Sequence, residues 1–182
     1  AISCDCGAPV GFDAVQEWAE TIASRAGKSA VLVEELIRDR KEMVFRRIKG
    51  SLYTNKVKCN DFVAMGDGSV ILPLIGWLYD YLGMVPASVT PSPGGDDSTA
   101  SRIRNLLKSM GSEDAWHSDP QSGRTDFVFA DGHTAESLEM TGHCRKGVDI
   151  GFPSLARTRF LPRPIYGISG AMYLLDEIFS RE

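Results

Sequence analysis

The chain has 182 residues, of which 43% are hydrophobic and 24% are charged, which suits one domain with a sizeable core. Its formal net charge is −4 and its Lys and Arg residues are scattered, so the basic surface of a nucleic-acid-binding protein is not expected. No apolar run approaches the roughly 18 residues that a membrane-spanning helix needs. Four cysteines are too few for a disulfide scaffold, and the first residues do not form a secretory signal. We therefore expect a cytoplasmic protein with reduced thiols and with no nucleic-acid or membrane partner.

Two helices are predicted before the first strand. In the segment 12–26, apolar residues recur at helical spacing, with Asp13 as a candidate cap and Gly27 as a stop signal. The segment 30–53 repeats this pattern, and its other, basic face is most simply solvated. We expect these helices to form an N-terminal helical segment over residues 1–56. The chain starts without Met, and we expect its start to be a cut or processed edge.

Strands and helices alternate from residue 61 onward. Strands are predicted at 61–65, 85–90, 127–130 and 148–151, with a weak strand near 115–116. Such alternation requires crossover connections and therefore a parallel sheet. The predicted fold is α/β: a Rossmann-like parallel sheet flanked by helices over residues 57–182, with an N-terminal two-helix extension.

Two residues near the first strand carry specific expectations. Pro73 lies in the helix that Gly83 closes, so it should fall in the first turn, where the helix needs no amide hydrogen. Cys59 directly precedes an apolar strand, and we expect it to be buried and inert.

The loops that follow the predicted strands form a candidate rim, because parallel sheets bind ligands at the carboxyl ends of their strands. The rim comprises the turn Gly66-Asp67-Gly68-Ser69 and the segments 90–97, 131–133 and 152–166. The turn could cradle an anion at a helix start. However, Ile71 stands where a dinucleotide fingerprint needs its third glycine, and no Walker A lysine follows. We therefore favour a tight turn that caps a helix over a nucleotide site.

Several rim residues could carry chemistry. His133 could donate a proton or orient a ligand, although a loop histidine without a role is equally plausible, and His117 and His143 have no such placement. Three arginines (Arg157, Arg159 and Arg163) crowd a proline-rich loop and could clamp an anionic cofactor or face a partner subunit. No G-x-S-x-G motif supports hydrolase chemistry.

Cys4 and Cys6 are weak metal-ligand candidates near the start of the chain. The sequence contains no C-x-x-C pair, and the spacing of its cysteines fits no standard ligand set. We therefore expect no metal site or cluster bound by this chain alone.

Five short sequence motifs occur in the same order as in one known protein family. They lie at residues 9–14, 66–86, 125–128, 151–153 and 166–178. The most specific are Gly151-Phe152-Pro153 and the closing Tyr166-Gly167-Ile168-Ser169-Gly170. On the basis of these motifs, the chain resembles the carboxy-terminal part of nitrogenase component 1-type oxidoreductases, most of all their beta-type subunits.

The resemblance implies a complex of paired component 1-type subunits that accepts electrons from an ATP-driven iron–sulfur reductase. It also implies a metal or tetrapyrrole site among three Rossmann-like domains, and an iron–sulfur cluster or related metallocofactor in the intact complex. The family's cluster cysteines belong to the amino-terminal portion, so Cys4 and Cys6 do not inherit that role. By the same resemblance, Asp131 and His133 and the loop with Phe152, Arg157 and Tyr166 would face the cavity. The turn with Gly66, Asp67, Gly68 and Ser69 stays a cavity candidate as part of the rim, but the resemblance makes it mainly the structural hinge of the domain.

Two departures from the family bear on function. Tyr166 stands where the nitrogenase alpha subunit has a cofactor-ligating histidine, and Ala156-Arg157 stands where the family has Asp-Arg. Both argue against a true alpha subunit. The resulting hypothesis is the C-terminal domain of a nitrogenase-like oxidoreductase subunit, inactive by itself. The alternatives are a non-catalytic scaffold for cofactor assembly and a stand-alone small-ligand-binding α/β module.

Overall fold

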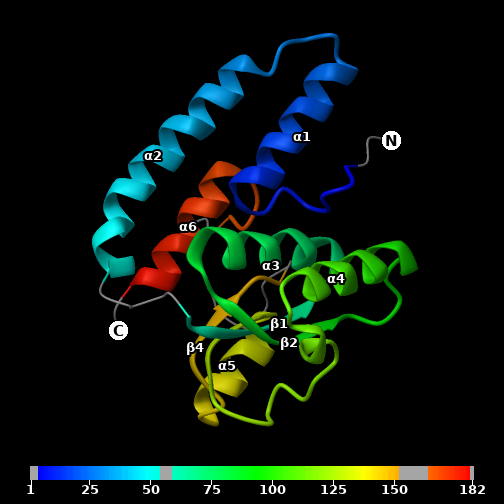
Figure 1. Cartoon of the computed structure of the whole chain (residues 1–182), viewed down its shortest axis with the longest axis vertical. Helices are drawn as coiled ribbons and strands as arrows, with labels where there is room; N and C mark the ends of the chain where they lie inside the picture. Colours follow the sequence, from blue (N-terminus) through cyan, green and yellow to red (C-terminus); the bar gives the residue numbers. More distant parts are fainter. Residues whose placement is uncertain (1–3, 54–58, 152–163, 181–182) are drawn as a thin grey trace.

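The computed structural model describes residues 4–53, 59–151 and 164–180 (Figure 1). The elements in chain order are α1 (Gly11–Arg25), α2 (Val31–Tyr53), β1 (Asp61–Gly66), α3 (Gly68–Leu82), β2 (Val85–Pro91), α4 (Asp97–Ser109), the short 3-10 helix η1 (Glu113–Ala115), β3 (Thr125–Ala130), α5 (Gly132–Met140), β4 (Cys144–Asp149) and α6 (Gly167–Phe179).

The four strands form one parallel sheet in the order β2-β1-β3-β4. Alternate residues of each strand face opposite sides, as the strand period requires. Phe62 of β1 and Phe129 of β3 belong to the larger core, whereas Val63 and Val128 belong to a smaller one. The predicted α/β fold with a parallel sheet is confirmed.

Helices cover the two faces of the sheet unequally. In Figure 1, α3, α4 and α6 lie on one side and α5 lies on the other. The larger core lies between the sheet and the first group, and its fully buried side chains include Phe62, Phe127 and Leu74. The smaller core pairs Val63 and the strand β3 with α5. Both faces of the central strands are therefore buried, which explains their apolar sequences.

The N-terminal helices join the larger core. Phe12 of α1 is fully buried, and its ring meets the rings of Trp77 and Tyr81 edge-on at centroid distances of 6.4 and 5.8 Å. Helix α2 contributes the buried Ile37 and Val44. The expected domain boundary at residues 56–57 lies outside the described residues.

Pro73 is the sixth residue of α3, so our expectation that it falls in the first turn is wrong. A proline at this position removes the N–H that would bond the carbonyl oxygen of Ser69. The N–H of Ala8 replaces it, at 2.7 Å from the Ser69 oxygen. The helix therefore tolerates the proline because another segment satisfies the freed acceptor.

Four smaller expectations are also corrected. Residues 115–116 do not form a strand; η1 ends there, and only Trp116 makes a single bridge to Val89 of β2. Strand β4 begins at Cys144 rather than at residue 148, and the polar Arg145 is tolerated because this is an edge strand.

Cys59 is exposed, because it lies in a left-handed turn (φ 66°) before β1. Asp13 lies in the first turn of α1, whose cap position is Val10.

Among the described residues, none of the helices combines the length and the apolar character needed to cross a bilayer.

Candidate functional site

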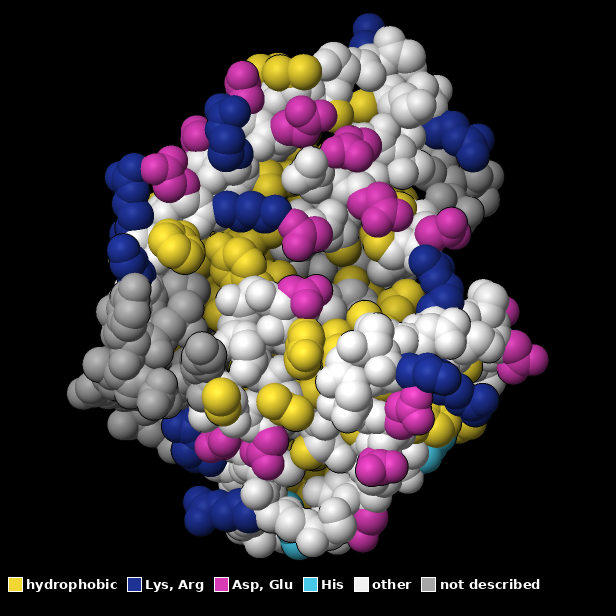
Figure 2. All heavy atoms as spheres, viewed as in Figure 1, with side chains coloured by type: hydrophobic (Ala, Val, Ile, Leu, Met, Phe, Trp, Pro, Cys, Tyr) yellow, Lys and Arg dark blue, Asp and Glu magenta, His cyan; other side chains and the backbone are white. Residues whose placement is uncertain are grey.

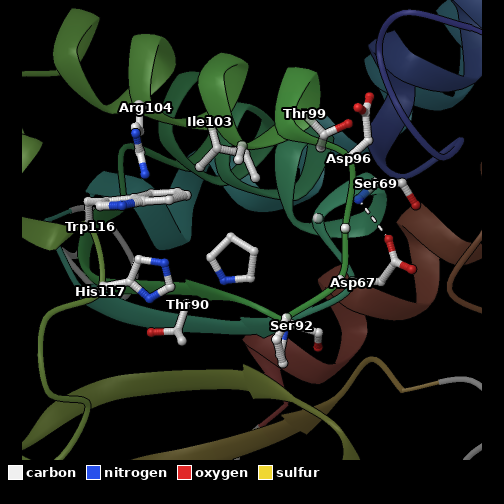
Figure 3. A pocket seen from close by; sticks show the side chains of 16 residues that line it. Asp67, Ser69, Thr90, Ser92, Asp96, Thr99, Ile103, Arg104, Trp116 and His117 are labelled. Carbon is white, nitrogen blue, oxygen red and sulfur yellow. Dashed lines mark hydrogen bonds between the residues drawn. The ribbon is translucent and has the colours of Figure 1, made fainter.

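A pocket of about 680 Å³ lies at the carboxyl ends of β1 and β2, against the first turns of α3 and α4 (Figure 3). This edge is where parallel sheets place their ligands, because the strand-to-helix loops converge there. Its wall consists of Asp67, Gly68, Ser69, residues 90–96, Thr99, Ala100, Ile103, Arg104, Trp116 and His117. Two of the rim segments predicted from the sequence, the Gly66 turn and the loop after β2, are thus brought together.

One end of the pocket is acidic. Asp67 caps α3 by accepting a hydrogen bond from the Ser69 N–H at 2.7 Å, and Asp96 caps α4 by accepting one from the Ser98 N–H at 3.2 Å. Hydrogen bonds from the hydroxyl and N–H of Ser98 lower the pKa of Asp96. Both helix starts therefore already hold a carboxylate where an anion would bind. The turn is a helix cap, and the phosphate-cradle interpretation has no support.

The other end of the pocket is aromatic and basic. The guanidinium of Arg104 lies 4.7 Å above the centre of the Trp116 ring, and the His117 ring meets Trp116 edge-on at 4.6 Å. Figure 3 shows these three side chains along one wall, opposite Asp67 and Asp96. This end suits a negatively charged group, which can pair with the Arg104 guanidinium that lies over Trp116.

His117 is a pocket residue that sequence reasoning missed. It follows η1, and its backbone is left-handed (φ 52°), an uncommon conformation for a residue other than glycine. The His117 N–H donates to the Val89 carbonyl oxygen at 3.0 Å, which attaches this loop to β2. This attachment is a tertiary contact, and no local pattern in the sequence predicts it.

Tyr166 lies beside the Gly66 turn but not in the pocket wall. It occupies the cap position of α6, and the following Gly167 N–H donates to the Pro9 carbonyl oxygen at 2.8 Å. Burial and the nearby carboxylate of Asp67 raise the pKa of the Tyr166 hydroxyl. The structure therefore brings two of the predicted cavity residues, Asp67 and Tyr166, into electrostatic contact.

Asp131 and His133 lie at the end of β3, away from the pocket wall. Asp131 caps α5 through hydrogen bonds from the N–H groups of His133 and Thr134, both at 3.1 Å. Burial would raise the pKa of Asp131, but a hydrogen bond from the Thr134 side chain, together with these two backbone hydrogen bonds, outweighs it and the pKa is lowered. The remaining predicted residues, Phe152 and Arg157, lie outside the described residues, as do Arg159 and Arg163.

The pocket wall does not offer a ligand set for a metallocluster. Its described lining contains no cysteine, and its ionisable side chains include His117 and the two helix-capping aspartates. Within the described parts of the chain, three metal-ligating atoms gather only at Cys4, Cys6 and Glu17, outside this pocket. Cys144 does not join them, because it is buried in the smaller core, where burial and Glu139 raise its pKa to about 11. The pocket thus fits the wall of a cavity and not a cluster-ligating site.

A parallel sheet with helices on both faces and a pocket at its carboxyl edge defines a Rossmann-like α/β domain. The family described as nitrogenase component 1 type oxidoreductase matches residues 3–181, and the chain belongs to this family.

A solved structure described as "Nitrogenase Cp1 at pH 6.5" is similar in fold, with a TM-score of 0.73 and 20% sequence identity. The matched region covers 93% of this chain but only 37% of that chain, so this chain corresponds to about a third of it. A search of curated protein sequences finds no match.

Proposed function

We propose that this chain is the C-terminal domain of a nitrogenase-like oxidoreductase subunit, in which it forms one wall of a metallocluster or tetrapyrrole cavity. The observation that carries the proposal is the pocket at the carboxyl edge of the sheet, in a chain of the component 1 family. Because the chain spans 37% of the similar nitrogenase chain, the other walls of such a cavity would come from further domains.

The described residues shape the cavity and leave ligation to other parts of the complex. When a metallocluster or tetrapyrrole is bound in the intact complex, that group stores and transfers the electrons. The chain's own contribution is binding and orientation: Arg104, which lies over the Trp116 ring, offers a charge for a carboxylate or other anionic group. The imidazole ring of His117 can donate or accept a hydrogen bond at the same wall.

The proposed partners are a homologous component 1-type subunit and an ATP-dependent iron–sulfur reductase. The proposed location of the complex is the cytoplasm. Support for a subunit partner comes from apolar side chains exposed where α1 ends and α2 begins. Ile22 is 48% exposed, Val31 51% and Leu32 80%. Figure 2 shows hydrophobic atoms at this end, with acidic and basic groups close to them. Clustered apolar exposure of this kind is typical of protein interfaces.

The test is anaerobic purification of the protein as encoded, followed by iron and molybdenum analysis, absorption spectroscopy and measurement of its mass in solution. We expect an oligomer that contains a metallocluster or a tetrapyrrole. An iron-free, tetrapyrrole-free monomer would contradict the proposal and favour the stand-alone ligand-binding module.

Matched histidine variants test the role of the pocket itself. His117→Phe should reduce the amount of bound cofactor, because His117 lines the pocket. His143→Phe serves as the control, because His143 directly precedes β4, at the amino-terminal edge of the sheet. Equal cofactor content in both variants and in the unmodified protein would show that the pocket does not bind the cofactor.

A non-catalytic scaffold for cofactor assembly is the second candidate. It is favoured by the lack of a ligand set in the described pocket wall, because a scaffold has to release the cofactor that it holds. The two functions differ in one measurement. An oxidoreductase accepts electrons from the reductase and turns over substrate, whereas a scaffold transfers its cofactor to another protein without turnover.

A further inference from the structure

Cys4 and Cys6 lie on a backbone segment that the rest of the fold holds in place. Gly7 has a left-handed backbone (φ 84°), and its carbonyl oxygen accepts a hydrogen bond from the Trp18 ring N–H at 2.6 Å. Its N–H donates to the Cys4 carbonyl oxygen at 3.3 Å, which closes a turn around the two cysteines. The next residue, Ala8, is bonded to Ser69. The turn is therefore fixed before any ligand arrives.

The two thiols converge on a carboxylate of helix α1. The sulfur of Cys4 lies 3.1 Å from the sulfur of Cys6 and 3.2 Å from Oε1 of Glu17. All three atoms lie within 4.8 Å of one another. Cys4 and Cys6 are half-buried, whereas Glu17 is exposed, so the group is open on one side.

These distances are close to those of a tetrahedral zinc site. With Zn–S bonds of about 2.3 Å and Zn–O bonds of about 2.1 Å, tetrahedral angles place the sulfurs roughly 3.8 Å apart and each sulfur roughly 3.6 Å from the oxygen. The two sulfurs, 3.1 Å apart, therefore need to separate by about 0.7 Å, and the Cys4 sulfur and the Glu17 oxygen, 3.2 Å apart, by about 0.4 Å. Small rotations of side chains at the surface supply such a movement.

We propose that Cys4, Cys6 and Glu17 bind one divalent cation of the zinc type, through two thiolates and one carboxylate. Sulfur ligands select soft or borderline cations over Mg²⁺ and Ca²⁺, and Zn²⁺ also accepts a carboxylate oxygen. A water molecule would take the fourth coordination position of the cation. The Thr21 hydroxyl lies nearby, 3.8 Å from the Cys4 sulfur.

The proposed site is separate from the pocket and does not depend on the proposed oxidoreductase function. It does not resemble the site of an iron–sulfur cluster, which takes four cysteines. A dithiol redox centre would use the two sulfurs alone, whereas here the Glu17 carboxylate joins them, with all three atoms within 4.8 Å of one another.

A bound cation would act as a structural clamp. The Cys4–Ala8 turn contacts α1 through Trp18 and α3 through Ser69. Asp5, between the two cysteines, also pairs with Arg102 of α4 at 3.9 Å. Joining the cysteines to Glu17 would therefore fix the segment before α1 against three helices at once.

Cobalt titration of the reduced, metal-free protein tests the proposal. We expect a single equivalent of Co²⁺ to produce a thiolate-to-cobalt charge-transfer band, and Zn²⁺ to displace it and to raise the melting temperature. Cys4→Ser and Cys6→Ser should each weaken binding by at least about tenfold and remove much of the band. Glu17→Gln, a change at an exposed position, should weaken binding while the thiolate band persists.

Cys59→Ser is the matched control, because Cys59 is also a free cysteine but lies in a different turn. It should leave the titration unchanged. No charge-transfer band in the reduced protein would overturn the proposal, as would loss of the band in Cys59→Ser alone. A Cys4–Cys6 disulfide that resists mild reductant, seen as a mass loss of two hydrogens, would overturn it in favour of a redox pair.

Discussion

The N–H of Ala8 donates a hydrogen bond to the carbonyl oxygen of Ser69 at 2.7 Å. In an uninterrupted helix this oxygen would be bonded by the residue four positions later, which here is Pro73 and has no N–H. The defect in α3 is therefore the docking point for the segment before α1. Because Ser69 also lines the pocket, this hydrogen bond connects the pocket wall to the turn that carries Cys4 and Cys6.

Replacing Gly7 by Ala should break this docking. A Cβ atom at position 7 would lie 2.4 Å from the Ser69 carbonyl oxygen and 3.1 Å from the Pro73 ring, and the residue has a positive φ of 84°. We expect Gly7→Ala to lower the free energy of unfolding by about 2–4 kcal/mol, the range of a steric clash added to backbone strain. Urea denaturation measures this change.

Gly142→Ala separates the two contributions. Gly142 has nearly the same backbone (φ 79°), but a Cβ there would meet nothing within 4 Å. This variant should lose only about 1 kcal/mol, the cost of the left-handed conformation alone. If Gly7→Ala and Gly142→Ala lowered the free energy of unfolding equally, the close approach of Gly7 to Ser69 would contribute nothing to stability.

Asp131 should stabilise the start of α5 in a pH-dependent way. Its carboxylate accepts two backbone hydrogen bonds. In spite of burial, a hydrogen bond from the Thr134 side chain and these two backbone hydrogen bonds lower the pKa of Asp131 in the folded protein. The stabilisation is therefore present above the unfolded-state pKa of about 3.9 and is lost as the pH falls through the folded-state pKa. Asp131→Ala should cost about 1 kcal/mol at pH 7.

The difference between the original protein and Asp131→Ala should shrink in acid, when both lack the carboxylate. Asp131→Asn is the control, because an asparagine oxygen caps helices nearly as well without an ionisable proton. Unfolding curves at several pH values provide the comparison. A loss in Asp131→Ala that stays constant down to acid pH would show that the charge of Asp131 does not contribute.

Lys146 should connect β4 to the end of α6. Its ammonium donates to the Glu177 carbonyl oxygen at 2.6 Å and to the Ser180 hydroxyl at 2.8 Å, and it is only 15% exposed. Lys146→Met keeps most of the apolar stem but removes the donor. We expect it to cost about 2 kcal/mol in thermal or chemical denaturation, because hydrogen bonds from charged groups contribute more than neutral ones.

Lys108→Met is the matched control for this prediction. Lys108 pairs with Glu113 at 3.9 Å, and both side chains are more than half exposed. A surface pair of this kind contributes at most about 0.5–1 kcal/mol. Comparable losses in the two variants would mean that the partial burial of Lys146 adds nothing to its interaction.

The alternation of strands and helices was sufficient to predict the parallel sheet, because its cause is local. Residues such as Phe62 and Val63 face opposite cores, and Gly83 ends α3 in the left-handed conformation that glycine favours. The start of β4 was missed because Arg145 and Lys146 are polar. Their side chains find partners in Asp126 and α6, which are distant in sequence.

The pocket could be predicted only in part, for the same reason. Asp67 and Ser69 follow β1 directly, so the rule for parallel sheets places them at the rim. His117 reaches the rim through the bridge of its neighbour Trp116 to Val89, which no spacing in the sequence indicates. The partner of Ser69 was likewise not predictable, because Pro73 shows that an acceptor is freed but not that Ala8 bonds it.

The exposed apolar end of the N-terminal helices should be a subunit contact. Leu32, in the first turn of α2, is 80% exposed, and burying a leucine in an interface contributes about 1.5–3 kcal/mol. Leu32→Asp should therefore weaken self-association, or association with a homologous subunit, by about tenfold or more, because each 1.4 kcal/mol changes the dissociation constant tenfold. Sedimentation or mass photometry over a dilution series measures the change.

Met140→Asp is the control for this last prediction. Met140 is 82% exposed, about as much as Leu32, but it ends α5 on the opposite side of the sheet (Figure 1). Because neither side chain belongs to the core, circular dichroism should show that both variants fold. Selective loss of association in Leu32→Asp would locate the interface on the helical hairpin. An equal effect of both variants, or none, would mean that exposure at the start of α2 does not mark a partner surface.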